Sequence, residues 1–137
     1  MTPNRTDDAS DWLKQQRGGK RPPTRALGSP HQLVSCPWCG SGLEPGRDIT
    51  VDTLSRRTLI TCPDPFCPFG PGVHDGDGLP VVVVDEEIYR LLPSLIIGTV
   101  DKFAQLTWRG ETEGLFGRVS KRCTRHGYVT ADTMAEK

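Results

Sequence analysis

Four of the five cysteines fall into two closely spaced pairs, and this pattern constrains the fold more than any other feature of the chain. Cys36 and Cys39 have the spacing C-x2-C, whereas Cys62 and Cys67 have the spacing C-x4-C. Proline and glycine stand within or directly after each pair, so the backbone can bend into a tight knuckle that directs two sulfurs to one point. Four thiolates at tetrahedral corners are a ligand set of structural Zn²⁺. The pattern therefore predicts a closed zinc site without an open position for catalysis.

Two other interpretations of these cysteines stay open. Cys36-Pro-Trp-Cys39 resembles a thioredoxin-type redox site, which requires a strand before the motif and a long helix after it. The residues that follow argue against such a helix, namely Gly40, Gly42, Pro45 and Gly46. A disulfide framework would leave the fifth cysteine unpaired, and no secretory signal is visible at the N-terminus. We therefore expect a reducing, cytoplasmic location, in which paired cysteines bind metal.

A further pair, Cys123 and His126, has the spacing C-x2-H. Two ligands do not complete a metal site, so this pair would need His74 or ligands from outside the chain. The alternative is a buried thiol next to a surface imidazole.

The composition narrows the choice of function. The 137 residues include 17 basic and 17 acidic side chains, which argues against a strongly charged tail but not against a local basic patch. The 15 glycines and 12 prolines indicate many turns and a thin core, which a bound metal would stabilise. No apolar run approaches the roughly 20 residues of a membrane span, so no membrane partner is expected.

The first part of the chain is predicted to be a zinc ribbon behind a flexible leader. The leader, residues 1–30, is polar and is expected to contain at most one short helical turn around Asp11–Gln16. Residues Ile49–Val51 and Thr58–Thr61 are β-branched runs separated by a turn, which indicates an antiparallel hairpin. That hairpin would connect the two knuckles, so residues 31–78 are expected to form the ribbon.

The second part is predicted to be an α/β segment over residues 79–128, followed by a tail over residues 129–137. Short apolar runs indicate buried strands at Leu79–Val84 and Leu95–Gly98. Cap residues and apolar spacing indicate two helices, Glu86–Leu92 after Asp85 and Val100–Trp108 after Thr99.

Residues Leu95–Leu106, L-I-I-G-T-V-D-K-F-A-Q-L, resemble motif Ib of superfamily 2 (DEAD/DEAH-like) helicases. The segment follows C-P-W-C-G, C-P-x-P-x-C-P-F and G-L-P-V-x-V-V-D-E-x-I-Y along the chain. In this order and spacing, over about residues 31–128, the motifs resemble the large helicase of the DISARM anti-phage defence system.

The resemblance implies a fragment of an ATP-dependent DNA helicase or translocase, in which the zinc ribbon precedes part of a RecA-like lobe. It implies that Thr99, Asp101 and Lys102 contact the nucleic-acid backbone, where a helix N-terminus favours phosphate. The implied partners are DNA, the remainder of a split or truncated helicase, and other DISARM components.

The ATP and Mg²⁺ of that family require a phosphate-binding loop and a DExx box. Gly19-Lys20 is followed by Arg-Pro, so it is not such a loop, and Asp85–Glu87 stands before the motif Ib segment instead of after it. We therefore expect no ATP hydrolysis by this chain alone. The alternative functions are a stand-alone zinc ribbon that binds nucleic acid or protein without enzymatic activity, and a small redox protein that uses Cys36 and Cys39.

Overall fold

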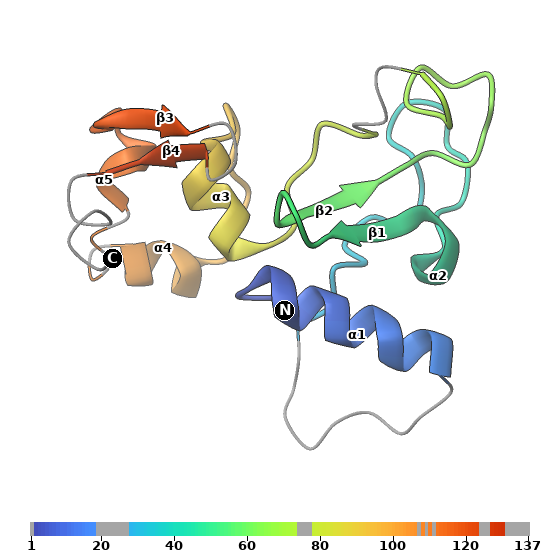
Figure 1. Cartoon of the computed structure of the whole chain (residues 1–137), viewed down its shortest axis with the longest axis horizontal. Helices are drawn as coiled ribbons and strands as arrows, with labels where there is room; N and C mark the ends of the chain where they lie inside the picture. Colours follow the sequence, from blue (N-terminus) through green and yellow to red (C-terminus); the bar gives the residue numbers. More distant parts are fainter. Residues whose placement is uncertain are drawn as a thin grey trace. The chain divides into compact units, whose positions relative to one another are not determined.

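The chain divides into two compact units, Met1–Asp85 and Glu86–Lys137, which are described separately (Figure 1). The computed structural model describes residues 2–18, 28–73, 78–106, 108, 110, 112–123 and 127–130. Within those ranges no helix has the length and apolar character that crossing a membrane requires.

An antiparallel hairpin forms the centre of the first unit (Figure 1). Its strands are β1 (Ile49–Asp52) and β2 (Arg57–Ile60), and the short helix α2 (Pro45–Asp48) leads directly into β1. Ile49 pairs with Ile60 in the register, and both side chains are buried. β-Branched side chains favour this half-buried extended backbone. The predicted antiparallel pair is confirmed.

The first helix is longer than the sequence pattern indicates. Helix α1 (Thr6–Gly18) contacts β1 and buries Ala9 and Leu13, which lie four residues apart on one helix face. The prediction of at most one helical turn in a flexible leader is wrong for these residues. A polar helix of this length is marginal in isolation, so packing against the hairpin is what stabilises it.

One apolar core connects α1, the hairpin and the cysteines. Its buried residues are Ala9, Leu13, Cys36, Leu43, Ile49, Ile60, Cys62, Cys67, Leu79, Val83 and Val84. The segment Leu79–Val84 contributes to this core without forming the predicted strand. The Leu79 backbone N–H donates to the Ile60 carbonyl oxygen at 2.7 Å, and the proline that follows has no N–H with which to extend a ladder. The apolar run at Leu79–Val84 therefore reflects burial in the core and not membership of a strand.

The second unit consists of short elements. They are α3 (Asp85–Leu91), which begins at the boundary between the units, α4 (Val100–Leu106), α5 (Thr112–Leu115), β3 (Lys121–Cys123) and β4 (Gly127–Val129). Strands β3 and β4 pair antiparallel, and the Arg122 guanidinium lies over the Tyr128 ring at 5.6 Å from its centroid. Both predicted helices are present, although α4 ends at Leu106 instead of Trp108.

The predicted buried strand at Leu95–Gly98 is absent. Leu95 is 77% exposed and Ile97 is 89% exposed, and the segment belongs to no strand pair in the described part of the chain. A strand of this apolar kind is stable when neighbouring strands and covering helices surround it. The described residues contain two separate two-stranded sheets and no parallel sheet, so the fold is confirmed only as a mixture of helices and strands.

Candidate metal centre

The four paired cysteines converge. The Sγ atoms of Cys36, Cys39, Cys62 and Cys67 all lie within 4.8 Å of one another. Two contacts between the pairs are 3.4 Å from Cys39 Sγ to Cys62 Sγ and 3.9 Å from Cys36 Sγ to Cys67 Sγ. Sulfurs at the corners of a tetrahedron with metal–sulfur bonds of about 2.3 Å lie about 3.8 Å apart. All four are free thiols that lie close enough together to hold one metal ion, and the disulfide interpretation is not supported.

The first knuckle is closed by two backbone hydrogen bonds. The Cys36 N–H donates to the Ser41 carbonyl oxygen at 2.8 Å, and the Gly40 N–H donates to the Cys36 carbonyl oxygen at 2.9 Å. Gly40 has a φ of +81°, which a residue with a Cβ adopts only with strain. The chain therefore reverses after Cys39 instead of entering the helix that a thioredoxin-type site requires.

The second knuckle begins directly after β2. The Cys62 N–H donates to the Phe69 carbonyl oxygen at 2.9 Å, and the Cys67 N–H donates to the Asp64 carbonyl oxygen at 3.1 Å. The Asp64 carboxylate accepts the Phe66 N–H at 2.9 Å, which is an Asx turn. These bonds fix the loop between the two cysteines.

An aromatic contact joins the knuckles. The Trp38 and Phe69 rings meet edge to face, with their centroids 5.9 Å apart and their planes at 78°. Trp38 stands between the first two cysteines and Phe69 follows the last two. Sequence reasoning missed this pair, although an aromatic residue next to each cysteine pair is a visible signal.

Backbone amides stabilise the charge of three sulfurs. The N–H groups of Ser41, Asp64 and Phe69 donate to the sulfurs of the cysteines two residues before them, which are Cys39, Cys62 and Cys67. Hydrogen bonds of this kind favour a thiolate over a thiol. This contact occurs at both sulfurs of the second knuckle and at the second sulfur of the first knuckle.

The exposed and buried cysteines differ in their pKa values. The pKa of Cys39, which is exposed, is lowered to about 7, chiefly by the Ser41 hydroxyl 3.2 Å from its Sγ. Burial raises the pKa of Cys62 to about 12 and also raises that of Cys67. A buried thiolate is unfavourable without a neutralising cation. The donor set therefore fits a metal ion that offsets the charge of the buried sulfurs.

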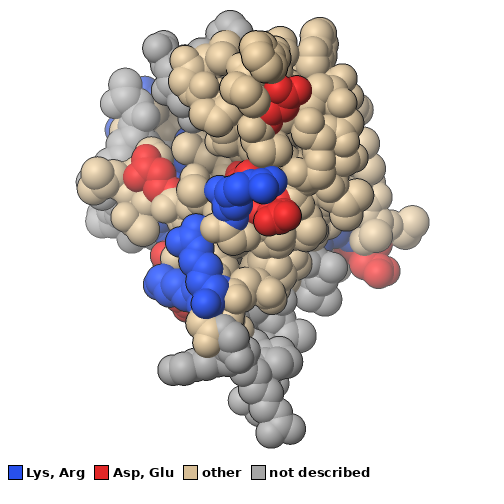
Figure 2. All heavy atoms as spheres, turned by 90° about the vertical axis from the view of Figure 1, so that its right-hand side faces the viewer, with Lys and Arg blue, Asp and Glu red and all other residues tan. Residues whose placement is uncertain are grey.

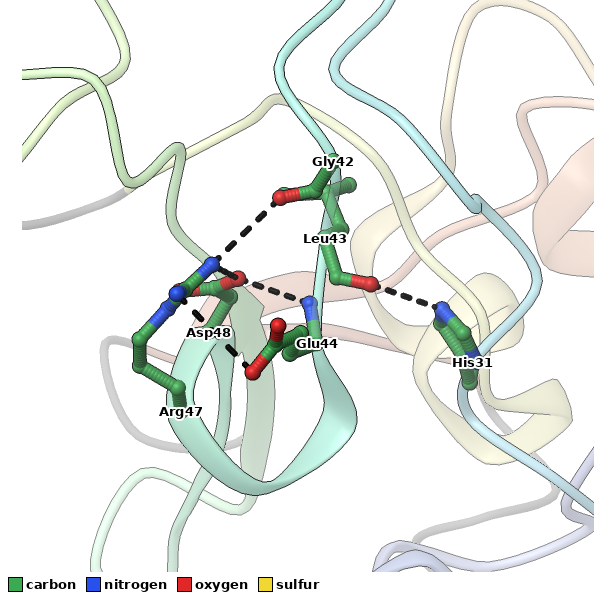
Figure 3. A network of polar contacts seen from close by, with 6 residues as sticks. All are labelled: His31, Gly42, Leu43, Glu44, Arg47 and Asp48. Carbon is green, nitrogen blue, oxygen red and sulfur yellow. Dashed lines mark hydrogen bonds and ion pairs between the residues drawn. The ribbon is translucent and has the colours of Figure 1, made fainter.

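A charged network supports the segment after the first knuckle (Figure 3). The buried Asp48 carboxylate accepts the Arg47 Nε–H at 2.7 Å, an Arg47 Nη2–H at 2.8 Å and the Glu44 backbone N–H at 2.7 Å. The bonds from Arg47 hold the pKa of Asp48 below its usual range, and the Glu44 N–H acts in the same direction. This network fixes α2 at the start of β1.

The same network reaches the first knuckle through backbone carbonyls (Figure 3). An Arg47 Nη2–H donates to the Gly42 carbonyl oxygen at 3.4 Å, and His31 Nε2 lies 3.1 Å from the Leu43 carbonyl oxygen. The first contact connects the segment after the knuckle to α2, and the second connects that segment to the one before the knuckle. Sequence reasoning missed these residues because neither Arg47 nor Asp48 belongs to a recognisable motif.

Of the predicted second pair of metal ligands, the structure describes one member, Cys123. Cys123 is half-buried at the end of β3, while His126 and His74 lie outside the described residues. In the part of the chain that the structure describes, the group of side chains placed to hold a metal is the four paired cysteines. The role of Cys123 and His126 stays a prediction.

The predicted nucleic-acid contacts lie at the start of α4. The Thr99 carbonyl oxygen accepts the backbone N–H groups of Lys102 at 3.0 Å and Phe103 at 3.3 Å. Thr99 and Asp101 are exposed, and Lys102 is half-buried. Their contact with nucleic acid stays a prediction.

A curated relative matches most of the chain. The DISARM protein DrmA of Bacillus paralicheniformis is 43% identical over 109 residues, which cover 77% of the chain. The resemblance to a DISARM protein is confirmed. Because 77% of 137 residues is about 105, a continuous match of this size includes residues 33–105 and therefore spans both knuckles and the start of α4. The chain covers 9% of the length of DrmA, and no family model matches it.

Proposed function

We propose that the chain is the zinc-ribbon segment of a DISARM-type, ATP-dependent DNA helicase or translocase that acts in defence against phage. The observation that carries this proposal is the match to the DISARM protein DrmA, which spans both cysteine pairs and the residues that resemble helicase motif Ib. The chain corresponds to a small part of DrmA. ATP binding and hydrolysis are therefore assigned to other parts of such a protein.

The metal in this proposal is Zn²⁺ with a structural role. Four cysteine sulfurs fill a tetrahedral site, which leaves no position for substrate or water. Three of the four sulfurs belong to buried residues of the core in the first unit. When bound, the metal would supply charge neutralisation and a cross-link between the knuckles, while the chain's own hydrogen bonds orient the sulfurs.

Nucleic-acid contact is assigned to the second unit because the knuckles carry the wrong charge for it. Residues 28–43 and 61–73 contain no lysine or arginine, and Asp64 is their one acidic residue. A Zn²⁺ ion with four thiolates adds a double negative charge, which repels phosphate. Figure 2 shows one face of the molecule, on which neutral residues predominate and a basic group near the centre lies beside acidic ones.

The second unit offers basic side chains instead. Lys102 is on α4, and Lys121 and Arg122 are exposed on β3. Arg118 Nη1 lies 3.6 Å from Glu113 Oε1, and this ion pair partly neutralises the charge of Arg118. In the proposal, the start of α4 contacts the nucleic-acid backbone through Thr99 and Lys102, which reads no base sequence.

A RecA-like lobe is the proposed setting of the exposed apolar run at Leu95–Gly98. Large apolar side chains such as Leu95 and Ile97 are rarely exposed together on a finished surface. Neighbouring strands from the rest of a longer protein would pair with this run and cover it. A stand-alone zinc ribbon is not favoured, because the match to DrmA continues well beyond the ribbon.

The test is phage resistance in a sensitive host that expresses the full protein containing this chain with the other DISARM components from the same genome. We expect the efficiency of phage plating to fall, and Cys62→Ser to restore it by disrupting the ribbon. Gln16→Ala, which alters an exposed side chain on α1 outside the cluster, is the control and should keep protection. Equal protection by the Cys62→Ser protein would contradict a required zinc ribbon, and no protection by the unaltered system would contradict the defence role.

A further inference from the structure

The four sulfurs of the metal centre differ sharply in accessibility. Cys36 and Cys67 are each 2% exposed and Cys62 is fully buried, whereas Cys39 is exposed. A Cβ placed on the neighbouring Gly40 would meet no atom within 4 Å, so the space next to Cys39 is open. A small molecule in solution therefore reaches one ligand of the centre before the other three.

A buried sulfur of the other knuckle, that of Cys62, lies close to this exposed ligand. Cys39 Sγ lies 3.4 Å from Cys62 Sγ, while the other close contact, Cys36 to Cys67, is 3.9 Å. A disulfide bond of about 2.05 Å requires the two sulfurs to approach by little more than one ångström. Oxidation can therefore join Cys39 and Cys62 with little movement of either knuckle.

We propose that Cys39 is the site at which hydroperoxides oxidise this centre, and that Cys62 then forms a Cys39–Cys62 disulfide with release of the metal. The inference rests on the proposed zinc centre. The Cys39 thiolate attacks one peroxide oxygen, the O–O bond breaks, and the products are a sulfenic acid and hydroxide or alkoxide. The Cys62 thiolate then attacks the Cys39 sulfur and displaces a second hydroxide. Two thiolates lose two electrons, and the hydroperoxide gains them.

The consequence for the fold follows from the place of the cysteines in the core. Zinc that loses two of its four ligands no longer holds the knuckles together. Cys36, Cys62 and Cys67 pack with Ile49 and Ile60, so the change reaches the hairpin. Reduction by a thiol and rebinding of zinc would reverse it. Cys39 would thereby make the stability of the first unit sensitive to peroxide.

The experiment uses the zinc-loaded chain with Cys123→Ser, which removes the thiol outside the cluster. Native mass spectrometry first confirms one zinc per chain. Hydrogen peroxide is then added, zinc release is followed with a chromogenic chelator, and free and oxidised thiols are labelled with two different alkylating agents. Trypsin leaves Cys36 with Cys39 on one peptide and Cys62 with Cys67 on another, so fragmentation must assign the label within each peptide.

We expect zinc release together with a Cys39–Cys62 disulfide as the first product, while Cys36 and Cys67 are still reduced. Cys39→His retains a ligand that zinc accepts but removes the exposed thiolate, and should slow peroxide-driven release by about tenfold or more. The matched control is Cys67→His, which replaces a buried ligand and should release zinc at the parent rate.

The outcomes separate the two proposals. A chain that binds no zinc overturns the zinc centre and this inference together. A zinc-loaded chain that first forms any other disulfide, or that keeps its zinc under peroxide, overturns the inference alone. If either histidine variant fails to bind zinc, the disulfide assignment in the parent chain still decides the matter.

Discussion

The two units of this chain close their apolar surfaces to different degrees. In the first unit, α1, the hairpin and both knuckles share one buried core. Among the described residues, large apolar side chains are exposed at four positions of the first unit and at eight positions of the smaller second unit, including Leu95, Ile97, Val100, Trp108 and Phe116. The difference is notable because both units consist of short elements and small two-stranded sheets.

The difference shows how a small unit can form a buried core. A two-stranded hairpin alone is at best marginally stable in water. The first unit adds a metal-ligand cluster and a packed helix, and both lie close to the hairpin in the fold. The described part of the second unit has no comparable cluster, and its apolar run at Leu95–Gly98 has no strand partner there. Clustered cysteines thus contribute to the small core of the first unit.

Removal of the metal should have the largest effect, because it should destabilise the first unit and leave the second unit largely unchanged. We expect Cys62→Ser, or a strong chelator, to unfold the first unit, because structural zinc contributes about 10 kcal/mol or more in small domains. Hydrogen exchange should become fast in β1 and β2 and change little in β3 and β4. Gln16→Ala, at an exposed position of α1, is the control with unchanged exchange. Slow exchange in β1 and β2 of a zinc-free chain would contradict the dependence of this unit on metal.

The pH dependence of zinc binding should be the next largest effect. Burial raises the pKa of Cys62 to about 12 and raises that of Cys67, so both are protonated thiols near neutral pH without metal. Zinc must displace these protons, so its affinity falls as the pH falls, by about tenfold per pH unit for each thiol.

Chelator competition at pH 8, 7 and 6 measures this slope. We expect a loss of at least about a hundredfold per pH unit from Cys62 and Cys67. Cys39 has a pKa of about 7 in the folded unit, and it adds to the slope over the whole range when loss of metal unfolds the unit. An affinity that is constant from pH 8 to pH 6 would show that the ligands are not these thiols.

The metal centre could be predicted from the sequence because its determinants are local. The spacing of Cys36, Cys39, Cys62 and Cys67, together with the β-branched runs between the pairs, was sufficient to predict that the sulfurs converge across a hairpin. The local signals do not include the Trp38–Phe69 contact or the bonds of Asp48, since these depend on how the loops pack.

The strands of the second part could not be predicted in the same way. The runs Leu79–Val84 and Leu95–Gly98 have the composition of buried strands, but a strand also needs a partner at the correct register. Leu79 bonds to the end of β2 at one point only, and Leu95–Gly98 pairs with nothing in the described ranges. The length of helix α1 was predicted too short because the polar sequence does not show that the helix packs against the hairpin, and this packing is what stabilises it.

A smaller effect is expected from the network that supports the first knuckle. Asp48→Asn should lower the free energy of unfolding by about 1.5–3 kcal/mol, since a buried carboxylate that accepts charged and backbone donors is replaced by a neutral amide. Urea unfolding at saturating zinc and pH 7 measures this. Glu44→Gln alters a mostly exposed carboxylate 3.8 Å from Arg47 and should change stability by less than about 0.5 kcal/mol. Equal effects of the two substitutions would show that burial of Asp48 is unimportant.

The smallest effect concerns nucleic acid, and it tests whether the two units differ in function as well as in packing. If the start of α4 contacts about three phosphates, binding should be weak and independent of sequence, with a log–log salt slope of about −2 to −3. Fluorescence anisotropy of labelled single-stranded and duplex DNA at two salt concentrations measures it. Lys102→Glu should weaken binding equally for all sequences and make the slope shallower by about one.

Lys14→Glu is the matched control on α1 in the first unit, where the side chain is 74% exposed, and should leave the slope unchanged. Thermal unfolding of both variants ensures that a change in binding does not reflect loss of the fold. Equal weakening by both substitutions would mean that any positive charge on the chain contributes, and the assignment of nucleic-acid contact to the second unit would then be wrong.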